Sequence, residues 1–365
     1  MRKGAKGKEQ KRGFGICGVD LFCGAGGLTR GLEKAGLEVR LGVDLDAECK
    51  FPYEENNSAR FLEKSVSDVN AAELNKAFEG AEYKLLAGCA PCQPFSTYQQ
   101  GKIGPSDERW NLLMEFGRLV REVNPDLVTM ENVPRLAEQE VFSEFVCLLE
   151  DSGFHVSHAV VNCADYGVPQ QRNRLVLLAS KLGELRLCPP TTPEGKRKTV
   201  RDAIGKLPPI EAGQRHDKDP LHHSSRLSEL NLLRIRASKP GGSWRDWDED
   251  LVAACHRKDT GKTYASVYGR MVWDAPAPTM TTQYFGFGNG RFGHPEQDRA
   301  ISLREGAVLQ SFPKGYKFVP KGAPIHTKHI GRLIGNAVPV NLGRAIGKSI
   351  IQHVEAIKAG EAEAA

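Results

Sequence analysis

No stretch of this 365-residue chain is long and apolar enough to span a bilayer, and the N-terminus lacks the apolar core of a signal peptide. We therefore expect a protein that stays in the cytoplasm. In that compartment the nine cysteines are reduced thiols, which excludes a disulfide framework. A strong excess of charge is lacking too, because 50 Lys and Arg residues against 45 Asp and Glu residues leave a net charge of +5. This balance is compatible with a nucleic-acid partner but does not by itself indicate one.

A second pair of cysteine or histidine ligands that would complete a zinc site is also missing. Cys89 and Cys92 have the spacing of a zinc-binding or redox pair. A structural zinc ion takes four ligands, and no convincing second pair of similar spacing occurs in the chain. The sequence therefore predicts no metal site.

Short apolar runs alternate with helical patterns from residue 16 to about residue 179, which is typical of an α/β domain with a mostly parallel sheet. Strands are expected at 17–22, 41–43, 84–87, 127–130, 155–161 and 174–179, and amphipathic helices at 28–36 and 111–123. After residue 181, prolines and glycines interrupt regular structure, and the stretch up to residue 270 is weakly periodic. From residue 330 a glycine-rich turn leads into a final helix that is expected to pack back on the first domain.

Three loops at the expected carboxyl edge of the sheet carry groups that suit an adenosine. The segment from Asp20 to Gly27 leaves a strand and enters a helix, and its glycines let the backbone approach a ligand, although a purely structural turn would look similar. Asp44 ends the next strand, where an acid commonly accepts hydrogen bonds from ribose hydroxyls, while Asp46 is equally suited to cap the next helix. Asp68 follows at a position from which it can accept from an adenine amino group. Together the three loops predict an adenosine pocket.

A second set of residues on the same edge carries reactive chemistry. Cys92 lies in a loop that the flanking prolines stiffen, which suits a nucleophile that must be aimed. Glu131 ends the next strand, although an isolated acid there is also a common turn cap. Arg172 and Arg174 are two residues apart in an extended segment, so they are expected to point the same way and form a forked cationic site.

These groups fit the methylation of cytosine at C5. That carbon is too weak a nucleophile on its own, and addition of a thiolate at C6, with a proton or hydrogen bond at N3, turns the ring into a reactive enamine. Cys92 is the expected thiolate, Glu131 the partner at N3, and an arginine steadies O2. A base in duplex DNA must be flipped out to reach such a site.

As an ordered set, the motifs resemble those of the bacterial-type DNA (cytosine-5) methyltransferase family. The resemblance rests on Asp20–Gly27, Asp44, Asp68, Pro91-Cys92-Gln93, Glu131-Asn132-Val133, the Gln-x-Arg-x-Arg block from Gln170 to Arg174, and Gly335–Pro339. It covers about residues 19–347 apart from a variable region. Two departures are Leu45, where many members carry an aromatic residue, and Cys89-Ala90-Pro91 in place of the frequent Gly-Pro-Pro.

The resemblance implies a Rossmann-like S-adenosylmethionine-dependent methyltransferase domain, joined to a smaller irregular target-recognition domain. It assigns catalytic roles to Cys92, Glu131, Arg172 and Arg174. The implied cofactor-binding residues are Asp20, Phe22, Gly24, Gly26, Gly27, Asp44, Leu45, Asp68, Val69, Asn336 and Val338. The implied DNA-contacting residues are Gln93, Ser96, Asn132, Gln170 and Thr279.

Together with the resemblance, changes in composition along the chain predict four segments. Residues 1–15 form a basic flexible tail, which is either solvated or an arm that touches phosphates. Residues 16–181 form the first part of the catalytic and cofactor-binding domain, residues 182–325 the target-recognition domain, and residues 326–365 the return to the first domain. Candidate recognition residues in the second segment are Arg215, His216, His222, His223, Arg226, Arg234, Arg236, Trp244, Arg245 and Trp247, although many of them are equally expected to cover the surface.

The expected partner is double-stranded DNA, and a companion restriction endonuclease is a further candidate partner. The expected products are the methylated base and S-adenosyl-L-homocysteine, made by a monomeric enzyme that associates with the nucleoid through DNA. Three alternatives stay open at this level. A cytosine-5 RNA methyltransferase shares the catalytic residues, but its usual Cys-Phe-Thr signature is lacking here. A DNA-binding protein without catalysis and a small-molecule methyltransferase are less compatible with the intact cysteine loop.

Overall fold

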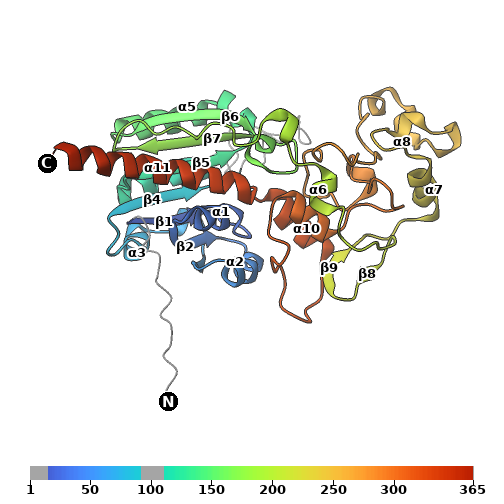
Figure 1. Cartoon of the computed structure of the whole chain (residues 1–365), viewed down its shortest axis with the longest axis horizontal. Helices are drawn as coiled ribbons and strands as arrows, with labels where there is room; N and C mark the ends of the chain where they lie inside the picture. Colours follow the sequence, from blue (N-terminus) through green and yellow to red (C-terminus); the bar gives the residue numbers. More distant parts are fainter. Residues whose placement is uncertain (1–14, 92–110, 365) are drawn as a thin grey trace, which may run out of the picture.

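A seven-stranded β-sheet organises the first half of the chain in the computed structural model (Figure 1), which describes residues 15–91 and 111–364. The strand order is β3-β2-β1-β4-β5-β7-β6. The first five strands are parallel to their neighbours, while β7 runs antiparallel to both β5 and β6. This mostly parallel sheet with helices on both faces confirms the predicted Rossmann-like α/β fold.

The strands of the sheet are β1 (Ile16–Leu21), β2 (Glu38–Asp44), β3 (Arg60–Glu63), β4 (Tyr83–Gly88), β5 (Leu127–Asn132), β6 (His155–Asn162) and β7 (Asn173–Ser180), and a separate hairpin pairs β8 (Arg215–His216) with β9 (Asp219–His223). The helices are α1 (Gly27–Ala35), α2 (Lys50–Asn56), α3 (Ala71–Ala77), α4 (Asn111–Val123), α5 (Glu140–Asp151), α6 (Val200–Ile204), α7 (Glu229–Ala237), α8 (Ala254–Arg257), α9 (Leu303–Leu309), α10 (Thr327–Asn336) and α11 (Val340–Ala364).

All six predicted strands are present, with ends that differ from the prediction by at most three residues. The sequence analysis missed β3, a four-residue edge strand that pairs only with β2 and has no buried residue. Without a buried side chain, β3 shows no alternation of apolar and polar residues that a sequence pattern could reveal. The predicted helices at 28–36 and 111–123 correspond to α1 and α4.

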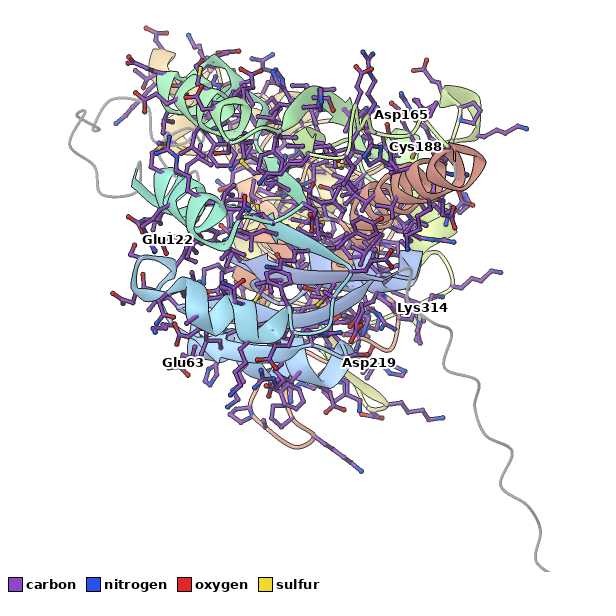
Figure 2. All side chains as sticks on the ribbon, turned by 90° about the vertical axis from the view of Figure 1, so that its left-hand side faces the viewer. Glu63, Glu122, Asp165, Cys188, Asp219 and Lys314 are labelled. Carbon is purple, nitrogen blue, oxygen red and sulfur yellow. The ribbon has the colours of Figure 1, made fainter. Side chains whose placement is uncertain are left out.

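Two layers of helices bury the two faces of the sheet. Apolar side chains of α3, α4 and α5 cover one face, and those of α1 and α11 cover the other. Figure 2 shows this layering from the end of the sheet, with Glu122 of α4 on one side and Cys188, whose thiol donates to Ala345 of α11, on the other. The core is therefore closed on both faces, as a parallel sheet requires.

Glycines let α11 lie directly against α1. A Cβ atom added to Gly31 would come within 2.5 Å of the Val340 carbonyl oxygen and 2.6 Å of the Arg344 amide nitrogen. Any larger residue at position 31 would therefore push the two helix backbones apart. This close approach fixes the C-terminal helix on the sheet after the long excursion of residues 182–339.

Residues 200–340 build a second lobe beside the carboxyl edge of the sheet (Figure 1). Its main core joins side chains of α6, β9, α9 and α10, and Ala25 and Cys49 from the first lobe pack against the same core. The sequence analysis expected a glycine-rich turn near residue 330, but this segment is α10, which packs on α9. The first element to rejoin the sheet is α11.

No helix in the described ranges is long and apolar enough to cross a membrane.

A buried ion pair stabilises the second lobe. The Arg299 guanidinium donates to both carboxylate oxygens of Glu305, at 2.7 and 2.8 Å, and both side chains are almost fully buried. Burial alone would raise the pKa of Glu305, but the hydrogen bonds and charge of Arg299 lower it to about 2. Burial also lowers the pKa of the adjacent His294 to about 4, so that ring is neutral near pH 7.

We expect Glu305→Gln to reduce the free energy of unfolding by about 3–5 kcal/mol, because it leaves the buried Arg299 charge without its partner. The contribution of the Glu305 carboxylate is complete above its usual pKa of 4.5 and is lost as the pH falls toward 2. The difference between variant and wild type in urea unfolding should therefore shrink as the pH is lowered below 4.5. Asp259→Asn, which removes an exposed ion pair with Lys262, is the control and should change little. A difference that grows on acidification would contradict this account.

Candidate cofactor and catalytic site

The ends of four parallel strands meet at one edge of the sheet. In the ladder, Leu21 at the end of β1 lies opposite Val43 on one side and Gly88 on the other, and Gly88 lies opposite Met130. The loops that follow β1, β2, β4 and β5 are therefore neighbours in the order 2-1-4-5. This edge is where ligands bind in open parallel sheets.

The loop after β1 makes a tight turn into α1. Phe22 and Gly24 have φ angles of 56° and 51°, in the left-handed region. The Gly24 amide donates to Asp44 Oδ2 at 2.8 Å, and a Cβ atom added to Gly24 would meet nothing within 4 Å. The backbone of Gly24 therefore faces open space, whereas the neighbouring Gly27 lies against the Val338 carbonyl. Gly26 has a φ of 84° and is the N-cap residue of α1.

Asp20 is buried under this loop. Its Oδ2 accepts a 2.6 Å hydrogen bond from the Thr29 hydroxyl, which also lies 2.9 Å from the Tyr53 hydroxyl. Its Oδ1 is buried and has no hydrogen-bond partner among the described residues. Burial raises the pKa of Asp20 to about 7. A buried acceptor without a donor is costly in a folded protein, and such an atom is expected where a ligand supplies the missing donor.

Asp44 and Leu45 follow β2 on the next loop. The Asp44 carboxylate accepts from the amides of Gly24 and Asp46, at 2.8 and 3.0 Å, and burial raises its pKa. Leu45 is 71% exposed, an unusual state for a large apolar side chain at the rim of a core. The Asp44 carboxylate, which can accept hydrogen bonds from hydroxyls, thus lies beside the exposed Leu45 side chain, which can pack against an aromatic ring.

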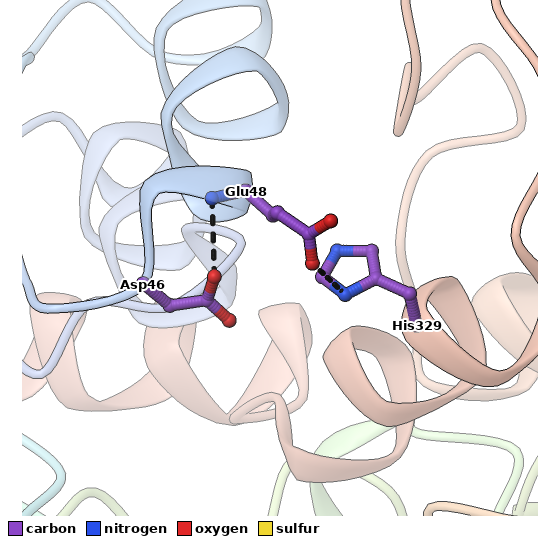
Figure 3. A group of neighbouring side chains, drawn as sticks. All are labelled: Asp46, Glu48 and His329. Carbon is purple, nitrogen blue, oxygen red and sulfur yellow. Dashed lines mark hydrogen bonds and ion pairs between the residues drawn. The ribbon is translucent and has the colours of Figure 1, made fainter.

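The same loop is clamped to α10 of the second lobe. Asp46 caps the short helix Ala47–Cys49 and receives the Arg332 guanidinium at 2.6 Å, while the Glu48 carboxylate contacts the His329 ring. Figure 3 shows the Glu48 carboxylate directed at the His329 ring, with Asp46 beside them. These three side chains could in principle hold a cation, but Arg332 Nη2 lies 3.2 Å from His329 Nδ1 and would repel one. We therefore interpret the group as an ion-pair clamp between lobes.

The remaining predicted cofactor residues lie in the segment after β3 and where α10 is followed by α11. Asp68 is exposed at the end of the short helix Val66–Asp68, and the buried Val69 follows it. Arg118 of α4 holds this turn by donating to the Val69 carbonyl at 3.1 Å. Asn336 is exposed as the last residue of α10, and Val338 is buried between α10 and α11. The return from the second lobe thus ends against Gly27.

Glu131 lies at the end of β5, 3% exposed, between a thiol and a guanidinium. The Cys89 thiol donates to Glu131 Oε2 at 3.1 Å. Arg174 Nε lies 2.9 Å from Glu131 Oε1 as an ion pair, yet the described residues offer Oε1 no hydrogen bond of proper geometry. Burial, and next the charge of Glu131, raise the pKa of Cys89 well above its usual value, so the thiol stays protonated.

Arg172 and Gln170 connect the two lobes. The Arg172 guanidinium donates at 2.9 Å to the carbonyls of both Met280 and Gly335. Gln170 is fully buried, accepts from the Met280 amide and donates to Gln310. Backbone carbonyls thus engage both terminal nitrogens of Arg172, while burial and next the charge of Arg174 lower its pKa to about 9. The expectation that Gln170 contacts DNA does not fit this burial.

The other predicted substrate residues are divided between buried and exposed positions. Asn132 is buried and donates to the Ala90 carbonyl at 3.0 Å, which ties the end of β5 to the loop after β4. Thr279 is exposed and donates to the Gln171 carbonyl at 2.6 Å. Cys92, Gln93 and Ser96 lie outside the described residues.

The family model described as C-5 cytosine-specific DNA methylase matches residues 16–352. The chain belongs to this family. It is 54% identical over 343 residues to the Type II methylase M.HgiDII of Herpetosiphon aurantiacus, covering 93% of this chain and 96% of that one. It is also 32% identical over 351 residues to the Type II methyltransferase M.Eco47II of Escherichia coli, covering 93% and 79%.

Solved structures of low sequence identity share the fold of this family member. One is a proposed DNA modification methyltransferase encoded within an Escherichia coli prophage, with a TM-score of 0.70 at 22% identity and coverage of 93% and 99%. Another is a DNMT2 mutant of Spodoptera frugiperda, with a TM-score of 0.60 at 18% identity and coverage of 93% and 99%. Family membership makes the chain a DNA (cytosine-5) methyltransferase that uses S-adenosylmethionine.

The residues at the sheet edge fit that cofactor. Asp20 offers a buried oxygen without a donor, Gly24 borders open space, and Leu45 exposes an apolar side chain beside the Asp44 acceptor. An adenosine sulfonium ligand carries positive charge that suits Asp20, hydroxyls that suit the Asp44 acceptor, and an aromatic ring that suits the Leu45 side chain. When bound there, the cofactor supplies the methyl group.

Two features of the site are not predicted by the sequence. The Thr29 hydroxyl that donates to Asp20 and the Tyr53 hydroxyl beside it lie on helices, and no motif marks them. The contact of Cys89 with Glu131 could not be predicted from the sequence, because it arises from the pairing of β4 with β5. The position of Cys89 in the opening of the cysteine loop was the only available signal.

We expect Asp44→Ala to raise the Kd for S-adenosylmethionine about 10- to 100-fold, because hydrogen bonds to a charged group contribute about 1.5–3 kcal/mol. The change also releases the Gly24 amide, which destabilises the turn that borders the pocket. Isothermal titration calorimetry measures the effect directly. Glu63→Ala is the control, since Glu63 lies opposite Asp44 in the ladder but is exposed on the edge strand. An unchanged Kd would exclude Asp44 as a cofactor ligand.

Proposed function

We propose that the enzyme methylates a flipped-out cytosine in a specific duplex sequence through a covalent bond between Cys92 Sγ and C6. The Cys92 thiolate adds to C6, and the electron pair displaced toward the ring makes C5 nucleophilic. C5 takes the methyl group that the cofactor supplies. Loss of the C5 proton to a base then restores the double bond and expels the thiolate.

One oxygen of Glu131 lies in an ion pair with Arg174 but accepts no hydrogen bond, and this observation best supports the mechanism. Glu131 Oε1 is buried without a hydrogen bond, while Oε2 is occupied by the Cys89 thiol. The Watson–Crick edge of a cytosine that is protonated at N3 offers the donor that Oε1 lacks. Arg174, beside the same oxygen, is the cation available to the O2 atom of the ring. We assign Arg172 a connecting role in place of the predicted catalytic one.

We assign the cofactor contacts by the position of each group. Phe22 and Leu45 contact the adenine, Asp44 accepts from the ribose, and Asp68 with Val69 borders the adenine edge. Asp20 faces the positive charge of the amino acid part, which explains its unpaired oxygen. Gly24, Gly26, Gly27, Asn336 and Val338 shape the pocket where α10 and α11 return to the first lobe.

We propose that the second lobe recognises the target sequence. The side chains of Arg215, Arg226, Arg236 and Arg245 are exposed on it and are candidates for contact with phosphates or bases. His222, Arg234, Trp244 and Trp247 are buried instead, so they lie in the interior of the lobe. His222, for example, lies 2.8 Å from both the Ser302 hydroxyl and the Pro208 carbonyl. Thr279 is exposed and directly precedes Met280, whose backbone binds Gln170 and Arg172. Thr279 therefore remains a candidate for contact with DNA.

A companion restriction endonuclease is the proposed functional partner. The relatives M.HgiDII and M.Eco47II are both named as Type II enzymes, and they match nearly the whole of this chain. Methylation of one short sequence throughout the host DNA would protect it from such a nuclease.

We expect Cys92→Ser to bind S-adenosylmethionine as the wild type does and to lose almost all methyl transfer, since a serine hydroxyl is scarcely ionised near neutral pH. Transfer of labelled methyl to mixed-sequence duplex DNA measures activity, and calorimetry measures cofactor binding. Cys188→Ser, a change remote from the sheet edge, is the matched control. Wild-type-like turnover in Cys92→Ser would rule out the covalent route.

Mapping 5-methylcytosine by bisulfite conversion tests the substrate. We expect cytosines that resist conversion to lie within one short recurring sequence of the duplex. Full conversion of the DNA, together with methyl incorporation into tRNA, would instead favour the RNA alternative.

A further inference from the structure

We infer that Cys89 is a positioning residue for Glu131, and that its thiol fixes the orientation of the Glu131 carboxylate toward the substrate base. The inference rests on the role proposed for Glu131. Cys89 stands in the opening of the cysteine loop, where the sequence departs from the frequent Gly-Pro-Pro.

The backbone holds Cys89 opposite Glu131. Cys89 directly follows β4, and in the parallel ladder Gly88 pairs with Met130, so the next residues of the two strands are Cys89 and Glu131. The Cys89 amide donates to the Leu21 carbonyl at 3.3 Å, which continues the pairing with β1 for one more residue. The neighbouring Ala90 is fixed by the Asn132 amide group. The contact therefore depends on main-chain positions that are held from two sides.

The thiol acts as a hydrogen-bond donor at this site. Its 3.1 Å contact with Glu131 Oε2 joins a thiol to a buried carboxylate, and a charged acceptor strengthens the otherwise weak S–H bond. A thiolate here would place a second negative charge beside Glu131 in a buried site, which is unfavourable. Cys89 is therefore suited to donate a proton in a hydrogen bond and unsuited to act as a nucleophile.

The hydrogen bond to Cys89 limits the rotation of the Glu131 carboxylate. The terminal torsion of a glutamate is broad, so a carboxylate without this bond would adopt a range of orientations. Cys89 engages Oε2, while Oε1 lies beside Arg174 without a hydrogen bond. Fixing Oε2 orients the carboxylate plane, and Oε1 is left ready for the base before the substrate arrives. Positioning of this kind acts on the rate of the chemical step.

The test compares Cys89→Ala, Cys89→Val and Cys89→Ser in steady-state transfer of labelled methyl to mixed-sequence duplex DNA. Alanine and valine lack a donor and bracket the volume of cysteine, while serine retains a donor. We expect kcat to fall about 3- to 10-fold in the alanine and valine variants, which is the effect of one lost hydrogen bond. KM for DNA and for the cofactor should stay within about twofold of the wild type, because ground-state binding is retained. Cys89→Ser should recover most of the lost kcat.

Cys17→Ala is the matched control, because its buried thiol on β1 donates to the Ala77 carbonyl and does not touch Glu131. It should lower thermal stability without changing kcat. A fall in kcat for Cys17→Ala equal to that for Cys89→Ala would overturn the inference.

A double-mutant cycle with Glu131→Gln separates the inference from the proposed function. Single-turnover assays with excess enzyme keep slow variants measurable. We expect Glu131→Gln to lose most activity and Cys89→Ala to have little further effect in that background, since the thiol acts only by orienting a carboxylate that Glu131→Gln has already replaced. If Glu131→Gln retains wild-type turnover, the proposed role of Glu131 fails and the role of Cys89 with it. If Glu131→Gln is impaired but Cys89→Ala matches the wild type, or is equally harmful in both backgrounds, the Cys89 inference alone is overturned.

Discussion

The register of the parallel strands β1, β2, β4 and β5 is the constraint on which the site depends. Leu21 pairs with both Val43 and Gly88, so the three loops that follow these strands begin at the same level of the sheet. The Gly24 amide can then reach Asp44, and the Cys89 thiol can reach Glu131. A slip of one residue in any strand would turn the side chain at its end toward the opposite face. The side chains proposed for cofactor binding and for catalysis are thus positioned by the main-chain hydrogen bonds between the strands that precede them.

The second lobe is joined to this edge by polar contacts with backbone atoms. Arg172 donates to carbonyls of residues 280 and 335, and Gln170 contacts the Met280 amide and Gln310. Arg332 adds an ion pair, and His329 a polar contact, from α10 to the loop after β2. Each contact links a residue of the site to an element that returns from the second lobe. The proposed site therefore includes residues of both lobes, although most of its residues lie at the edge of the sheet.

Three of the seven buried polar side-chain atoms without a hydrogen bond in the described part of the chain lie where function is proposed. Asp20 Oδ1, Glu131 Oε1 and Arg172 Nε are buried and have no hydrogen bond among the described residues. Such atoms reduce stability, and the folded chain tolerates them because packing elsewhere compensates. The two carboxylate oxygens face the expected sites of the cofactor and the base, whereas the Arg172 atom lies at the joint between lobes. Binding of ligand would satisfy the first two atoms and raise the stability of the folded enzyme.

The sequence by itself determined the α/β fold, six of the seven strands of the sheet, and the identity of the residues at the ends of β1, β2 and β5. It did so because buried strands are apolar runs, and because glycines, acids and a proline-flanked cysteine at their ends form motifs along the chain. Tertiary structure alone decided that Gln170 is buried, that Arg172 binds carbonyls while Arg174 faces Glu131, and that the Cys89 thiol contacts Glu131. The partners in these contacts are between 42 and 163 residues apart in the chain. Contacts at such separations leave no periodic or local pattern, since they form only when the sheet and the second lobe close around one edge.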